Sequence, residues 1–160
     1  MVNVTLSIPV ELKQKMDLFA AKAEVLVLPV FSGEGFSAEA IVARLPESIR
    51  KSASRSMKAS EFIGKASEVV AIDVHDAAHH HILVIGLGSM KDATLESARE
   101  MIGTAIACTR RFGAKTLAVE IPVSDEGDVA DVAEAMVVAA QLADYAFDTY
   151  KEKNGAKRMK

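Results

Sequence analysis

The chain has 160 residues, of which half are hydrophobic and 26% are charged, and its net charge is −3. This composition is typical of one globular domain, excludes a disordered chain, and gives no overall positive charge for binding nucleic acid or a membrane surface. Cys108 is the only cysteine, so an intrachain disulfide is excluded. Residues 1–16 lack the pattern of a secretory signal, and no apolar run is long enough to span a membrane. We therefore expect a soluble, cytoplasmic protein.

The first half of the chain alternates apolar runs with helical patterns, which is typical of a sheet covered by helices. Residues 2–8 alternate between apolar and polar, which predicts an edge strand, with a short helix or turn after it. Residues 24–31 (EVLVLPVF) are almost continuously apolar, which predicts a strand buried on both faces. A helix is expected over 38–45, broken by Pro46, with more helix to about Met57.

Two more strands are predicted in the middle of the chain, over 67–74 and 81–88. A helix follows, with Thr94 as its N-cap and apolar residues every three or four positions over 95–112. Gly113 is expected to end this helix, because glycine takes a positive φ angle easily.

The last helix, expected over about 128–144, has an unusually narrow polar stripe. It follows a predicted strand over 115–123 and the acidic capping sequence SDEGD. Its polar residues recur three and seven positions apart, while the rest are almost all Val, Ala, Met or Leu. They are Asp131, Glu134, Gln141 and Asp148. One sheet covers only one side of a helix, so we expect a second helix or another domain to cover the remainder.

Two glycine-rich turns are the candidate ligand-binding loops. Gly86 and Gly88 form a G-x-G between a strand and a helix, where backbone N–H groups could cradle a phosphate; the alternative is a tight turn. The third glycine of a dinucleotide fingerprint would fall on Lys91. The other loop, FSGEGFS, carries Gly33 and Gly35.

Potential metal ligands gather in DVHDAAHHH, namely Asp73, His75, Asp76, His79, His80 and His81. Neighbouring residues of a strand point to opposite faces, so a solvated loop between two strands is favoured over a metal site. Cys108 lies on the apolar stripe of its helix, which predicts a buried, unreactive thiol. No complete set of catalytic or metal-binding residues is recognised.

Four stretches together resemble the amino-terminal domain of the leucyl aminopeptidase (cytosol aminopeptidase) family. They are EVLVLPVFSG, EFIGKASEVV, HILVIGLGSMKDATLESAR and YAFDTYKEK. The closing pattern Y-x-F-D-x-Y-K corresponds to Tyr145, Phe147, Asp148, Tyr150 and Lys151. The chain departs from the family pattern at Ser67, where a glycine is usual, and its histidine-rich loop has no obvious counterpart.

The resemblance implies a macro-domain-like, three-layer α/β/α sandwich with a mixed sheet. It implies that 1–150 form the N-terminal domain and that 151–160 begin a linker to an absent C-terminal catalytic domain. That domain would hold two divalent metals, Zn or Mn, and remove N-terminal residues from peptides. Tyr145, Phe147, Tyr150 and Lys151 would then contact it, and the parent enzyme would be a homo-oligomer, a hexamer by family.

We consider three alternative functions for the chain. The first is a non-catalytic accessory domain that packs against the catalytic domain and aids oligomer assembly. The second is a free-standing macro-like domain that binds a nucleotide or ADP-ribose. The third, DNA binding, has only residues 151–160 and a basic patch in its favour, and the net acidity opposes it. The patch consists of Arg50, Lys51, Arg55 and Lys58.

Overall fold

The computed structural model describes residues 11, 17–74, 79–124 and 127–157, with side chains of the last helix described as far as Asp144. The strand predicted over 2–8 lies outside these residues. The strands are β1 (Val25–Ser32), β2 (Val69–Asp73), β3 (His81–Ser89) and β4 (Leu117–Val119). The helices are α1 (Ala38–Arg44), α2 (Glu47–Ala59), α3 (Leu95–Arg111) and α4 (Val129–Lys157), with single 3-10 turns η1 (Leu18–Ala20) and η2 (Met90–Asp92).

The four described strands form one mixed sheet in the order β2-β3-β1-β4. β1 lies at its centre and pairs in parallel with β3 and with β4, whereas β2 pairs antiparallel with β3. Parallel partners need long crossovers, and helices contribute to them here: α1, α2 and β2 lie between β1 and β3 in the chain, and α3 lies on the further path from β3 to β4. The predicted mixed sheet is confirmed.

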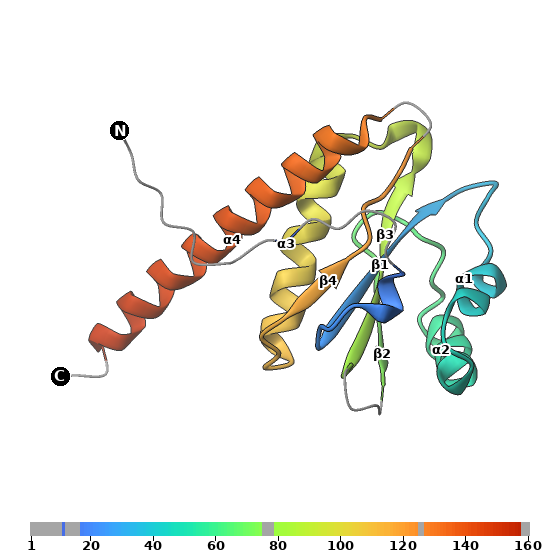
Figure 1. Cartoon of the computed structure of the whole chain (residues 1–160), viewed down its shortest axis with the longest axis horizontal. Helices are drawn as coiled ribbons and strands as arrows, with labels where there is room; N and C mark the ends of the chain where they lie inside the picture. The colour runs from blue at the N-terminus through green and yellow to red at the C-terminus, as the bar shows by residue number, and fades with distance from the viewer. Residues whose placement is uncertain (1–10, 12–16, 75–78, 125–126, 158–160) are drawn as a thin grey trace.

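The sheet is covered on both faces, which makes three layers (Figure 1). Leu26 and Leu28 of β1 belong to the core cluster that includes α1 and α2, whereas Val25 and Val27 belong to the cluster that includes α3 and α4. All four side chains are fully buried, because successive residues of a strand face opposite sides. The predictions of a three-layer sandwich and of a strand buried on both faces are both confirmed.

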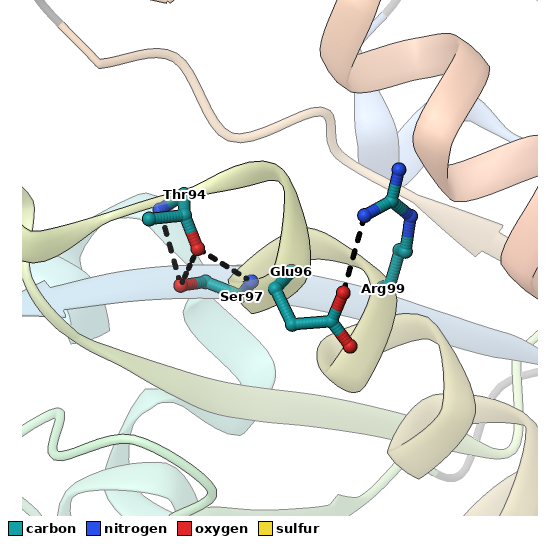
Figure 2. A network of polar contacts seen from close by, with 4 residues as sticks. All are labelled: Thr94, Glu96, Ser97 and Arg99. Carbon is teal, nitrogen blue, oxygen red and sulfur yellow. Dashed lines mark hydrogen bonds and ion pairs between the residues drawn. The ribbon is translucent and has the colours of Figure 1, made fainter.

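The ends of α3 follow the sequence closely. Thr94 accepts a hydrogen bond from the Ser97 amide, and the Ser97 hydroxyl accepts one from the Thr94 amide, so two otherwise unpaired N–H groups are satisfied (Figure 2). Glu96 forms an ion pair with Arg99 at 3.1 Å on the next part of the helix surface. At the other end Gly113 has a φ of 73°, as predicted.

Two elements differ in length from the prediction. β4 has three residues where nine were expected, because its ladder with β1 covers only Leu117 to Val119 and Pro122 soon follows without an amide hydrogen. The last helix continues to Lys157, well past the predicted end near Asp144, and its far part extends beyond the sheet in Figure 1. In the described part of the chain, no helix has the length and apolarity needed to cross a membrane.

Candidate functional site

The glycines of the G-x-G turn lie in β3, where another segment of the chain crosses them. A Cβ atom on Gly86 would lie 2.0 Å from the carbonyl oxygen of Lys65, which is far inside van der Waals contact. The Gly86 amide donates to the Glu68 carbonyl at 2.8 Å, and the Gly88 amide donates to the Gly64 carbonyl at 3.0 Å. Both amides therefore have partners within the chain, and the absence of side chains lets residues 64–68 pack against the sheet.

The crossing segment is held in shape by the Glu68 carboxylate. One of its oxygens accepts hydrogen bonds from the amides of Ile63 and Lys65, both at 3.0 Å. Gly64 and Ser67 both have positive φ angles, 80° and 68°. Ser67 thus occupies a left-handed position, which explains why the family pattern usually has glycine there.

Gly33 and Gly35 lie in the exposed turn between β1 and α1. Gly33 has a φ of 110°, and its carbonyl accepts a hydrogen bond from the Phe36 amide at 3.0 Å. A Cβ atom added at either glycine would meet nothing within 4 Å. The two candidate glycine loops therefore differ: one is covered by the chain, and the other faces open space.

A cleft of about 340 Å³ opens at the carboxyl ends of β1 and β3, between the N-terminal ends of α3 and α4. It is lined by Phe31, Leu87, Ala93, Thr94, Leu95, Ser97, Ala98, Pro122, Ser124, Gly127, Asp128, Asp131 and Val132. Of these, Leu87, Ala98 and Pro122 are buried, so the cleft has an apolar floor. In open α/β sheets ligands bind at this end of the strands.

The mouth of the cleft carries two carboxylates from the start of α4. Asp128 accepts a hydrogen bond from the Ala130 amide at 2.8 Å, so it caps the helix as the SDEGD sequence predicted. Asp131 lies three residues further on and is exposed. The cleft could not be predicted from the sequence, since its residues come from five separated parts of the chain. No local sequence pattern reports it, because the strand order of the folded sheet is what brings the ends of β1 and β3 together.

The side chains of His79 and His81 contact different parts of the chain. The His79 Nε2 atom lies 2.8 Å from the Ala21 carbonyl oxygen. The His81 Nδ1 atom lies 3.0 Å from the Asp73 carboxylate, and the His81 ring stacks on Phe112. His75 and Asp76 lie outside the described residues. Among the residues that are described, no group of three His, Cys, Asp or Glu side chains could hold a metal ion.

Cys108 and Arg50, which belongs to the basic patch of α2, both contact other parts of the fold. Cys108 is half-buried and packs against the core cluster between the sheet and α3, so it is less enclosed than predicted. The Arg50 guanidinium donates to the carbonyl oxygens of Leu45 and Ala43 at 2.8 and 2.9 Å. It thereby satisfies backbone groups at the C-terminal end of α1, which lack partners within that helix.

α4 packs on α3 through one face and leaves another face exposed. Ala133, Ala135 and Met136 are buried, while Val138 and Leu142 are 41% and 64% exposed. Val138 and Leu142 are four residues apart and so share one side of the helix. Further along, Arg110 of α3 donates to the Asp144 carboxylate at 2.7 Å and to the Ala143 carbonyl at 3.2 Å, which joins the two helices.

The candidate contact residues of the closing pattern follow on the same helix. The backbone is helical at Tyr145, Phe147, Tyr150 and Lys151. Their side chains lie outside the described part of the structure.

The architecture is that of a macrodomain-like α/β domain, and comparison with solved structures agrees. A macrodomain of Mycobacterium tuberculosis DarG superposes with a TM-score of 0.59 at 20% identity, over 81% of this chain and 88% of that one. A mutant tomato leucine aminopeptidase superposes with a TM-score of 0.60 at 16% identity, over 79% of this chain and 27% of that one. At these identities the likeness concerns the fold.

The sequence comparisons are more specific. The family model of the cytosol aminopeptidase family, N-terminal domain, matches residues 27–154, so the chain belongs to that family. A probable cytosol aminopeptidase of Geobacter sp. is 28% identical over 62% of this chain and 20% of its own length. One from Aquifex aeolicus is 26% identical over 70% of this chain and 22% of its own length. The chain thus spans about a fifth of the length of these curated relatives.

Proposed function

We propose that this chain is a non-catalytic accessory domain of a cytoplasmic dimetal leucyl aminopeptidase, which packs against a C-terminal catalytic domain and contributes to oligomer assembly. The observation that carries the proposal is the match of the family's N-terminal model to residues 27–154. The relatives named above are cytosol aminopeptidases about five times as long as the matched part. In this proposal the peptidase chemistry and its two Zn or Mn ions belong to the other domain.

The exposed side of α4 supports a packing role. Leu142 and Val138 present apolar surface that the described part of the chain leaves uncovered, which is the situation that the narrow polar stripe predicted. In our proposal residues 1–150 form the domain, 151–160 begin the linker, and Tyr145, Phe147, Tyr150 and Lys151 contact the catalytic domain. The backbone of this region as far as Lys157 is helical, so such a linker would begin as a continuation of α4.

Two measurements test the proposal. The first is the mass of the endogenous protein detected by an antibody against this chain; a species several times longer supports it, whereas a species of the chain's own size contradicts it. The second is hydrolysis of leucine p-nitroanilide by the purified chain with Mn²⁺ or Zn²⁺ added. We expect no turnover, and turnover that persists through stringent purification would contradict a non-catalytic role.

A second candidate function is binding of a nucleotide or ADP-ribose-type ligand. The position and size of the cleft favour it, since ligand pockets are typically about 300–1,000 Å³, whereas the carboxylates of Asp128 and Asp131 in the lining oppose a phosphate group. The exposed turn at Gly33 and Gly35 is a further candidate loop, whereas the amides of Gly86 and Gly88 are already paired. Calorimetric titration with ADP-ribose distinguishes the two functions, because the accessory role predicts no binding heat.

A further inference from the structure

We propose that the cleft between α3 and α4 binds a small organic cation, with an ammonium group at Asp128 and Asp131 and an apolar body on the floor of the cleft. This site is additional to the accessory role and does not depend on it. It also differs from a nucleotide site, because the ligand carries the opposite charge. The charges and the shape of the cleft support this assignment.

The charge of the lining is negative. Asp128 and Asp131 are its only ionisable side chains among the described residues, and neither lysine, arginine nor histidine lines the cleft. The two helix N-termini oppose this with about half a positive charge each. Two carboxylates outweigh two such helix ends, so the described lining keeps a net charge of about −1, which a cationic ligand would neutralise.

The helix ends are also already supplied with acceptors. Asp128 accepts from the Ala130 amide of α4, and the Thr94 hydroxyl accepts from the Ser97 amide of α3. Figure 2 shows the second of these caps, with the two side chains turned toward each other. A phosphate would therefore compete with acceptors of the chain itself and would meet two carboxylates as well. A cation meets neither obstacle.

The apolar part of the cleft continues onto its rim. Phe31 and Leu87 lie at the inner end, and Leu95, which also lines the cleft, is 39% exposed. The site thus offers apolar surface beside negative charge, which matches a ligand with an apolar body and one ammonium group.

Three probes with the same phenyl group and different head groups test the assignment: phenethylamine, 2-phenylethanol and 3-phenylpropanoate. Binding to the 160-residue chain is followed by ¹H–¹⁵N chemical shifts. We expect saturable shifts for the amine at residues 93–98 and 127–132, and a dissociation constant lower than that of the alcohol by about fivefold for each carboxylate approached. The carboxylate probe should bind more weakly than the alcohol.

Variants provide the control. Asp131→Asn should weaken binding of the amine by about fivefold and leave the alcohol unaffected. Asp128→Asn should act in the same direction, because asparagine retains the capping hydrogen bond and so keeps the helix start intact. Glu134→Gln removes the same charge from α4 outside the cleft and should change little.

Four results would overturn the proposal. They are equal affinities for amine and alcohol, shifts located away from the cleft, an equal effect of Glu134→Gln and Asp131→Asn, and tighter binding of the carboxylate probe or of ADP-ribose. The comparison of the three probes uses the unmodified chain, so the test stands even if a variant fails to fold.

Discussion

Replacing Ser67 with glycine should stabilise the domain. Ser67 has a φ of 68°, in the left-handed region where a residue with a Cβ atom is disfavoured by about 1–2 kcal/mol. Glycine removes this strain, but its greater freedom in the unfolded chain offsets about 0.5–1 kcal/mol. The net gain expected for Ser67→Gly is therefore about 0.5–1 kcal/mol in the free energy of unfolding. For a chain of this size, that corresponds to a rise in Tm of about 1–4 °C.

Urea denaturation followed by circular dichroism measures this gain, and Ser67→Ala is the matched control. Alanine keeps a Cβ atom at the same φ angle and removes only the hydroxyl, so the strain should remain and no stabilisation is expected. If Ser67→Gly leaves the midpoint unchanged or lowers it at the same m-value, the strain inferred from the φ angle is refuted. Equal stabilisation by alanine would also refute it, because the effect would then not depend on the left-handed backbone.

Three further changes test other contacts. Gly86→Ala should destabilise the domain by about 2–3 kcal/mol, since the added methyl overlaps a backbone carbonyl oxygen; an unchanged urea midpoint would contradict this. The hydrogen bond from the Lys115 amide, with smaller contributions beside it, lowers the pKa of Glu24. The Glu24 carboxylate therefore stabilises the fold above the ordinary glutamate pKa, and its contribution is lost as the pH falls through the lowered value. The difference in the free energy of unfolding between the parent chain and Glu24→Gln should accordingly shrink on acidification. A difference that does not change with pH would contradict the role given to the Glu24 carboxylate. Arg110→Met should cost about 1–2 kcal/mol through the charged hydrogen bond to Asp144, and a double-mutant cycle with Asp144→Asn should show coupling.

Much of the fold could be predicted because local patterns and global packing agree. The apolar run of β1 is removed from water only if both of its faces are buried. Pro46 separates α1 from α2, because proline has no amide hydrogen to continue the hydrogen bonds of a helix. The end of β4 could not be predicted in the same way. Its apolar residues continue past Val119, and only the extent of pairing with β1 sets its length.

The candidate site was harder to predict than the fold. A G-x-G pattern reports that a backbone approaches closely, but it does not report whether the approaching group is a ligand or another part of the chain. At Gly86 it is Lys65, which lies 21 positions away in sequence and enters through a loop with its own positive φ angles. The cleft depends on residues from β1 to α4, so only the strand order brings them together.

The central position of β1 also has a consequence for synthesis of the chain. Val25 pairs with His81 and with Leu117, so the two partners of β1 are synthesised 56 and 92 residues after it. At roughly 5–20 residues per second on the ribosome, the second partner is made about 5–18 s after β1. Until β3 is made, both edges of this apolar strand lack a partner, and one edge still lacks its partner until β4 is made. The nascent domain is therefore most prone to aggregation, and most in need of a chaperone, before β4 is complete.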